Sequence, residues 1–202
     1  RDGAIAEARL QRTATLVLQG PADLPLREAA LQTLAWRDLD DAERSTCPPV
    51  IVLADRSTLR GAGLDGLSRL LASDADVKVV LLDDGDPLDG SPDPALIALA
   101  HRRAFVATTS IAFPTHLFGS IAAALATPGP ALVRIPAPSP RRHGFAPAVV
   151  LERARLAVTA RVQPLLRYDP AGPGVFGKRL SLEGNPDPSA AWPQAADGTA
   201  VT

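Results

Sequence analysis

The chain has 202 residues, of which 46% are hydrophobic, and its formal net charge is −1. This composition excludes a disordered chain and allows an α/β domain with a core, while the balanced charge gives no electrostatic reason to expect nucleic acid or an anionic membrane as a partner. No apolar run approaches the ~18 residues of a membrane span, and the one cysteine, Cys47, excludes an internal disulfide framework. We therefore expect a cytoplasmic protein. The complete lack of methionine predicts a processed piece or an excerpt of a longer polypeptide.

Residues 1–48 are expected to form an N-terminal strand-helix segment and a linker. Ala4–Leu10 has the composition of the end of a helix, and Thr15–Gln19 is predicted to be a short strand. Apolar residues at helical spacing predict a helix over Arg27–Leu39. The polar stretch Asp38–Thr46 then predicts a linker.

Residues 49–162 show a regular alternation of strands and helices. Continuous apolar strands that alternate with helices of about 9 to 14 residues are typical of a parallel sheet buried on both faces. The expected fold class is therefore α/β, with a mainly parallel sheet and helices on both faces. Strands are predicted at Val50–Ala54, Val77–Leu82, Ala104–Thr109 and Ala131–Ile135, and helices at Leu64–Ala72, Pro94–Arg102, Pro114–Ala126 and Ala148–Arg161.

Residues 163–202 differ in composition from the preceding domain because proline and glycine become frequent. Within them, Lys178–Trp192 has strand-like alternation followed by asparagine and proline. We interpret this part as a Pro/Gly-rich arm that lies on a partner or on the rest of a larger chain. A frayed tail is the alternative.

Acidic residues follow two of the predicted strands. Ligands of parallel α/β sheets bind beyond the carboxyl ends of the strands, and carboxylate oxygens suit Mg²⁺. A magnesium site is one interpretation, and ordinary capping and solvation of loops is the other. The acids are Asp55 after the first strand and Asp83, Asp84, Asp86 and Asp89 after the second.

The three histidines, His101, His116 and His143, lack the spacing of a metal triad, and we expect structural roles for them. The pairs Arg102–Arg103 and Arg141–Arg142 are suited either to hold an anion or to face solvent. The sequence contains no nucleophile elbow, phosphate loop, dinucleotide-binding fingerprint or paired-cysteine motif. No catalytic residue is therefore assigned.

Four stretches occur in an order that is familiar from one protein family. They are ADRSTLRGAGLDGLSRLLASDADVKVVLLDD, ALIALAHRRAFVATTSIAFPTHLFGSIAAAL, TPGPALVRIPAPSP and, more weakly, LEGNPDP. The run from Val50 to Arg142 resembles the C-terminal thiamine-diphosphate-binding domain of pyruvate:ferredoxin (or flavodoxin) oxidoreductases. The resemblance implies a thiamine-diphosphate-binding fold.

The resemblance also implies a set of site residues, which departs from the family's pattern. The family's Gly-Asp-Gly is here Ala54-Asp55-Arg56, and its neutral asparagine is replaced by an aspartate. The missing glycine removes the close backbone approach to a diphosphate. The implied cofactor-binding residues are Asp55, Arg56, Gly61, Gly63 and Asp89, and the implied Mg²⁺ ligands are Asp55, Asp84 and Asp86.

An iron–sulfur ligand of the family is expected just after the strand Ala131–Ile135. Pro138-Ser139 stands there instead of a cysteine, and the upstream cysteine pair is absent. Because such a cluster needs about four thiolates, we expect no iron–sulfur cluster ligated by this chain.

Two functions from different classes follow from this resemblance. The first is a non-catalytic docking module of a 2-oxoacid oxidoreductase-like protein, with an altered cofactor motif, that contacts other domains or subunits and forms a homo-oligomer. The alternative is a working Mg²⁺–thiamine-diphosphate half-site of a 2-oxoacid oxidative decarboxylase. A small-molecule sensor that uses the old cofactor cleft is a third possibility.

Overall fold

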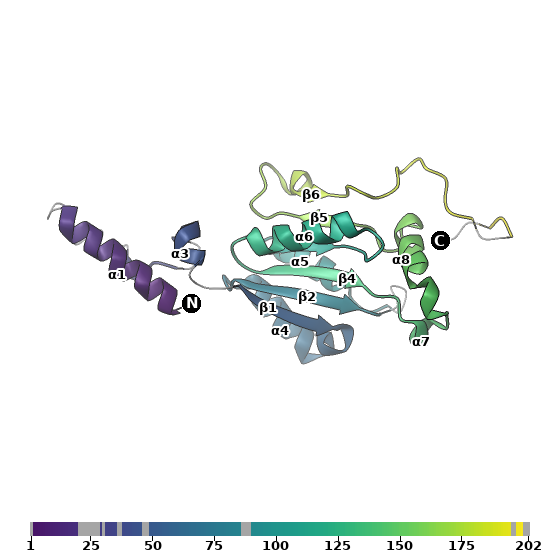
Figure 1. The fold of residues 1–202 in the computed structure, drawn as a ribbon, viewed down its shortest axis with the longest axis horizontal. Helices are drawn as coiled ribbons and strands as arrows, with labels where there is room; N and C mark the ends of the chain where they lie inside the picture. The colour runs from purple at the N-terminus through teal and green to yellow at the C-terminus, as the bar shows by residue number, and fades with distance from the viewer. Residues whose placement is uncertain are drawn as a thin grey trace.

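A computed structural model describes residues 2–19, 29, 31–35, 38–45, 49–85, 90–194 and 197–199. Its centre is a six-stranded sheet of order β1-β2-β4-β3-β5-β6, with helices on both faces (Figure 1). The first four strands in this order are parallel, and the last two are antiparallel additions at one edge. The expected α/β fold class is confirmed.

The strands are β1 Val50–Asp55, β2 Val77–Asp83, β3 Phe105–Thr108, β4 Ala131–Pro136, β5 Leu166–Tyr168 and β6 Leu180–Ser181. The α-helices are α1 Asp2–Gln19, α3 Asp41–Ser45, α4 Ala62–Ala72, α5 Pro94–His101, α6 Pro114–Ala126, α7 Pro140–His143 and α8 Val150–Thr159. Short 3₁₀ helices are η2 Arg56–Leu59, η3 Pro147–Val149 and η4 Phe176–Arg179.

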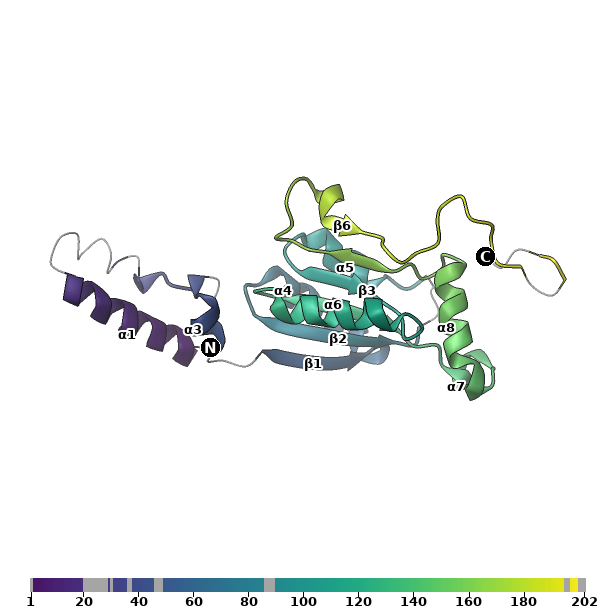
Figure 2. The same cartoon turned by 45° about the horizontal axis from the view of Figure 1, so that its top comes forward.

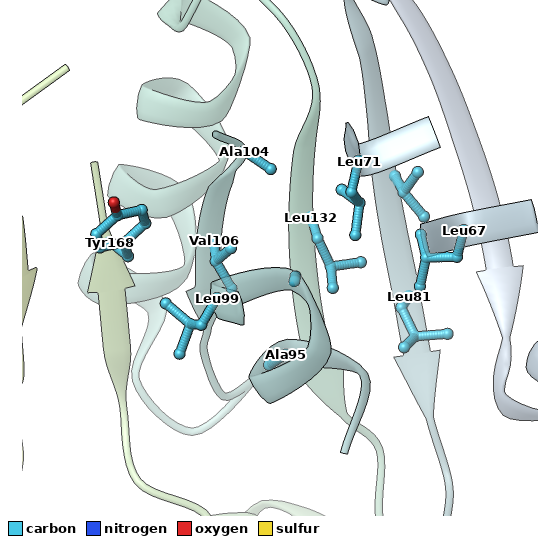
Figure 3. Packing of buried hydrophobic residues seen from close by; sticks show 11 residues of the cluster. Leu67, Leu71, Leu81, Ala95, Leu99, Ala104, Val106, Leu132 and Tyr168 are labelled. Atoms are coloured by element: carbon cyan, nitrogen blue, oxygen red, sulfur yellow. The ribbon is translucent and has the colours of Figure 1, made fainter. Parts of the chain in front are cut away.

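Helices α4 and α5 cover one face of the sheet. Alternate residues of β2, such as Leu81, point to this face and pack in one cluster with Leu67 and Leu71 of α4 (Figure 3). Leu132 and Tyr168 continue the same cluster along β4 and β5. The Tyr168 hydroxyl donates a hydrogen bond to the Arg102 carbonyl oxygen at 3.2 Å, so burial of the ring leaves no unpaired polar group. Each fully buried leucine contributes about 1.5–3 kcal/mol to the stability of this face.

Helix α6 covers the opposite face over β3 and β4 (Figure 2). Its residues Leu117, Ile121 and Ala124 pack on Phe105 and Val133. Pro114 occupies the first turn of α6, where its missing N–H leaves no intrahelical bond unmade. The strands and helices predicted between residues 49 and 162 are confirmed to within two residues at each end.

The predicted strand Thr15–Gln19 is wrong, because these residues form the end of helix α1. A short apolar run is compatible with either structure, and tertiary contacts decide between them. Ala8 of α1 is buried against Leu34 and Leu39, and Arg12 donates two hydrogen bonds, of 2.8 and 2.6 Å, to the Glu43 carboxylate of α3.

Helix α3 itself lies where the sequence predicted only a linker. Its Glu43 amide donates to the Asp40 carboxylate at 2.8 Å, and the Asp40 amide donates back to Glu43. This reciprocal pair is a capping box, which starts a helix in a polar stretch. Of the predicted helix Arg27–Leu39, the structure describes residues 29, 31–35, 38 and 39; residues 29, 31 and 32 are helical and 33–35 are not, so the helix ends earlier than predicted. Cys47 lies outside the described residues.

The C-terminal part contacts the rest of the chain. Strands β5 and β6 extend the sheet, although only Leu180–Ser181 of the predicted alternation is a strand. Further on, Arg161 donates hydrogen bonds of 2.9 Å to the carbonyl oxygens of Asp187 and Ala190, and its guanidinium lies 4.3 Å from the Trp192 ring centre. Among the described helices, none is both long and apolar enough to cross a membrane.

Candidate functional site

The carboxyl ends of β2 and β4 carry a buried ion-pair network. The Asp83 side chain is fully buried and accepts a hydrogen bond from Arg134 Nε at 2.6 Å. Arg56 Nη1 donates to both Asp83 oxygens, at 3.1 and 2.9 Å, and the Gly85 amide donates at 3.0 Å. Arg134 Nη1 also donates to Asp93 at 3.2 Å. We call Arg56, Asp83, Asp93 and Arg134 the Asp83 network.

Local structure positions each member of this network. Asp83 ends β2, and Arg134 lies on the neighbouring strand β4, where Leu81 and Arg134 are opposite each other. Arg56 begins η2, directly after β1. Asp93 is the N-cap of α5 and accepts from the Ala95 amide at 2.7 Å, so one of its oxygens caps the helix while the other pairs with Arg134.

The network keeps Asp83 ionised. Burial by itself raises the pKa of a carboxyl group, and this is the largest single influence on Asp83. The attraction and hydrogen bonding of Arg134, the Gly85 amide and the charge of Arg56 together outweigh it, so the pKa of Asp83 lies below its usual value. The two aspartates and two arginines have formal charges that sum to zero.

Three cavities surround the network. One of about 300 Å³ lies between Asp83 and Pro138. A second, of about 100 Å³, lies against Asp93 and Arg134. A third, of about 300 Å³, lies between Arg56 and Gly61. Residues of the network line each of these cavities. Two of the cavities have volumes at the lower limit for ligand pockets, and the third is smaller.

The predicted metal ligands are distributed around this network. Asp55 caps η2, since its Oδ1 accepts from the Thr58 amide at 3.1 Å and the Ser57 hydroxyl at 2.6 Å. The Ser57 and Thr58 hydrogen bonds lower the pKa of Asp55. Asp84 is half exposed and lies 3.6 Å from Arg142 Nη1.

Asp86 and Asp89 lie outside the described residues. Within the described part of the chain, no group of three or more histidine, cysteine, aspartate and glutamate side chains is arranged to hold a metal ion. The prediction of Asp55, Asp84 and Asp86 as Mg²⁺ ligands stays a prediction.

The two glycines predicted to contact a cofactor have different structural roles. Gly61 has a φ of +54°, a conformation that favours glycine, and precedes α4. Gly63 lies so close to η2 that a β-carbon would meet the Thr58 carbonyl oxygen at 1.7 Å. Gly63 therefore serves the packing of α4 on η2, whatever else it contacts.

Two charged side chains at this end of the sheet, Asp83 and Arg56, are engaged within the chain and are not available to a Mg²⁺–diphosphate. Asp83 is neutralised by two arginines, and one oxygen of Asp55 is already used in the η2 cap. The Arg56 guanidinium, which follows the altered glycine position, points to Asp83 and does not remain available for phosphate. A metal ion at the carboxyl ends of β1 and β2 would compete with these charge-assisted hydrogen bonds.

The histidines and Ser139 have protein partners. His101 Nε2 lies 2.8 Å from the Ser68 hydroxyl, and His116 Nδ1 lies 3.0 Å from the Thr109 hydroxyl. His143 Nδ1 lies 3.0 Å from the carbonyl oxygen of Ser139, which is the N-cap of α7. These contacts agree with the structural roles expected for the histidines.

The sequence analysis missed two members of the network, Asp93 and Arg134, and for Arg134 a signal was present. The signal was a single charged residue inside the apolar strand ALVRIP. A charge at a fully buried strand position requires a buried partner, so Arg134 itself predicted that one of the strand-end aspartates is not free for a metal.

Comparison with known proteins shows similarity over part of the chain. It is 37% identical over 85 residues to pyruvate synthase subunit PorB of Methanosarcina barkeri, covering 42% of this chain and 28% of that protein. It is 34% identical over 73 residues to ketoisovalerate oxidoreductase subunit VorB of Pyrococcus abyssi and of Pyrococcus horikoshii, covering 36% of this chain and 24% of each relative. No protein-family profile matches. The chain spans about a quarter of the length of these curated relatives. Because pyruvate and ketoisovalerate are both 2-oxoacids, the chain is related over this stretch to subunits of 2-oxoacid oxidoreductases.

Proposed function

We propose that this chain is part of a 2-oxoacid oxidoreductase-like protein and serves there as a non-catalytic docking module. The Asp83 network is the observation that carries this proposal. Its four formal charges cancel, and its ion pairs engage two side chains, Asp83 and Arg56, that could otherwise hold a cation or a diphosphate. The relatives are subunits by name, which supports a role in an assembly.

The apolar edge of the sheet supplies the surface for such docking. In β1, Ile51 is 52% and Leu53 is 75% exposed. Both lie on the face that α6 partly covers, because Leu53 pairs with Val80, and Val80 packs in the α6 cluster. Leu82 of β2 is 48% exposed on the same face, and Phe118 of α6 is also exposed. Figure 2 shows that α6 lies over the middle of the sheet and leaves β1 open.

A strand from a second copy of this chain is the occupant that fits this edge. Strand β1 pairs only with β2 among the described strands, so its other side presents free backbone donors and acceptors. Residues 50–54 of β1 are apolar on both faces, and the strand contains no lysine or proline to block pairing. Pairing of β1 with its copy would bury these side chains and continue the sheet.

Sedimentation of the purified chain tests self-association. We expect a dimer or larger species that Leu53→Lys converts to a monomer, because the charge would be buried without a partner. Val175→Lys is a matched control, since Val175 is 72% exposed and far from β1 in sequence. A wild-type chain that sediments as a monomer at every concentration would contradict this part of the proposal.

Calorimetric titration with thiamine diphosphate, with Mg²⁺ and then with EDTA, tests the loss of the cofactor. We expect no Mg²⁺-dependent binding. The second candidate function, a Mg²⁺–thiamine-diphosphate half-site, is favoured by the position of Asp55 and the half-exposed Asp84 at adjacent strand ends. Mg²⁺-dependent binding that Asp55→Ala abolishes would establish that function in place of the docking module.

A further inference from the structure

A cavity of about 660 Å³ lies outside the Asp83 network. Its lining residues come from the N-terminal end of α6, from α8, from β5 and β6 and from the segments next to them; Figure 2 shows these elements. Its volume is within the range of small-molecule sites in proteins. The lining residues that the argument uses most are Phe113, His116, Arg155, Leu165, Arg167 and Glu183.

Two arginines from different elements line the cavity. Arg167 of β5 is held in place, since its Nε donates to the Ser120 hydroxyl at 2.9 Å and its Nη2 donates to the His116 carbonyl oxygen at 3.1 Å. No described residue accepts a hydrogen bond from Arg167 Nη1. The side chain of Arg155 of α8 forms no hydrogen bond or ion pair with any described residue. The cavity therefore has donors for an anion from one fixed and one adjustable guanidinium.

The start of α6 adds donors of the same kind. Its N-cap residue, Phe113, makes no side-chain capping bond, so the first-turn amides of Thr115 and His116 are not capped by a side chain. His116 Nδ1 lies near the Thr109 hydroxyl, which leaves Nε2 for a further contact. Burial, followed by the charge of Arg167, lowers the pKa of His116 against the opposing effect of Glu183. The imidazole is thus neutral near pH 7 and offers a hydrogen bond without a second charge.

The remaining lining residues differ in chemistry from the arginines. Phe113, Pro114 and Leu165 provide an apolar surface. Glu183, which follows β6, places one carboxylate at the cavity and has no ion-pair partner among the described residues. A simple inorganic anion would be repelled by Glu183 and would leave the apolar wall uncovered. A ligand that also carries a hydrogen-bond donor and a short hydrocarbon chain would satisfy all three surfaces.

We propose that this cavity binds a small organic acid with an ammonium or hydroxyl group next to its carboxylate and a short apolar side chain. Arg155 and Arg167 hold the carboxylate, Glu183 accepts from the neighbouring donor, and the hydrocarbon chain packs on Phe113 and Leu165. The site is separate from the Asp83 network and does not depend on the proposed docking role.

Calorimetric titration of the whole chain with four probes tests the site. The probes are L-leucine, 2-hydroxy-4-methylpentanoate, 4-methylpentanoate and inorganic phosphate. We expect saturable binding of one of the first two, at least about tenfold tighter than binding of 4-methylpentanoate or phosphate, because these lack the donor or the hydrocarbon chain. The first two probes differ only in the donor group, so the one with the higher affinity identifies ammonium or hydroxyl as the preferred group.

Variants on one helix provide a matched control. Arg155→Met is expected to weaken binding at least about tenfold through loss of a charge-assisted hydrogen bond. Arg153→Met changes an exposed arginine two residues away on α8 that lines a different cavity, and we expect unchanged affinity. Glu183→Gln is expected to remove the preference for the probes that carry a donor.

Three results would overturn the proposal. They are absence of saturable binding of all four probes up to about 10 mM, equal affinity for phosphate and the organic acids, and an equal effect of Arg153→Met and Arg155→Met. Because Arg155 and Arg153 are both exposed, neither variant threatens folding, which circular dichroism would verify.

Discussion

Arg134 and Asp83 form an ion pair between two neighbouring parallel strands, with Nε 2.6 Å from Oδ2 and side-chain exposures of only 5% and 0%. The pair lies at the carboxyl ends of the strands, where ligands of parallel α/β sheets bind. Interactions within the chain therefore occupy this position. The contribution of the ion pair to the free energy of unfolding can be measured.

Removal of Arg134 is expected to destabilise the fold strongly. Arg134→Met leaves Asp83 with Arg56 and the Gly85 amide as its remaining partners, and breaking a buried pair costs about 3–5 kcal/mol. Urea unfolding measures the loss. Arg69→Met is the control, because Arg69 pairs with Asp65 on the exposed side of α4 and such pairs contribute less than about 1 kcal/mol. Equal losses in the two variants would contradict the importance of burial.

The lowered pKa of Asp83 predicts a dependence of stability on pH. The unfolded state binds the proton more readily than the folded state, so the stabilisation is fully present above the unfolded pKa of about 4 and is lost as the pH falls through the folded pKa. The free energy of unfolding of the wild-type chain should therefore fall more steeply below about pH 4 than that of Asp83→Asn. Urea unfolding at several pH values measures both free energies. The same pH dependence in the two proteins would contradict a lowered pKa of Asp83.

Two glycines of helix α4 are predicted to respond oppositely to alanine. A β-carbon at Gly63 would overlap the Thr58 carbonyl oxygen, so Gly63→Ala must displace η2 and should cost at least about 2 kcal/mol. A β-carbon at Gly66 would meet no atom outside its own turn of helix within 4 Å, so Gly66→Ala should stabilise the chain by about 0.5–1 kcal/mol through helix propensity. Thermal unfolding of both variants provides the measurement. If Gly66→Ala destabilised the chain instead, the room available for a β-carbon would not explain the difference between the two glycines.

Arg161 is predicted to hold the C-terminal arm. It has a φ of +58°, so Arg161→Gly removes the guanidinium without strain in the backbone. Loss of the carbonyl hydrogen bonds and the Trp192 contact should raise hydrogen exchange of residues 187–194 by about tenfold or more. Arg141→Ala, at an exposed arginine of α7, is the control. Unchanged exchange would mean that the arm is held by other contacts.

Much of the fold could be predicted because local pattern and burial agree. Apart from Lys78, which pairs with Asp76, the run VKVVLL of β2 is apolar on both faces, as expected of a central parallel strand. Pro94 and Pro114 occur in the first turn of α5 and α6. The prediction failed at Thr15–Gln19, where the apolar run was too short to separate helix from strand. There the contacts of α1 with Leu34, Leu39 and Glu43 decided the structure.

The candidate site was predictable only in part. Strand ends are visible in a sequence, so the aspartates after β1 and β2 were found. Their partners were not, because Asp83 and Arg134 are 51 residues apart and meet only through the β2–β4 pairing. The same holds for the cavity between α6, α8 and β5, which joins residues from 112 to 184.

The sequence by itself determined the alternation of strands and helices and the placement of acids at strand ends, because these depend on periodicity and on neighbouring residues. Only the tertiary structure decided which aspartate is neutralised by arginine, which remains at the surface, and which edge of the sheet is left open. These outcomes depend on strand order and on the desolvation of charges brought together from distant positions, and no local pattern contains that information.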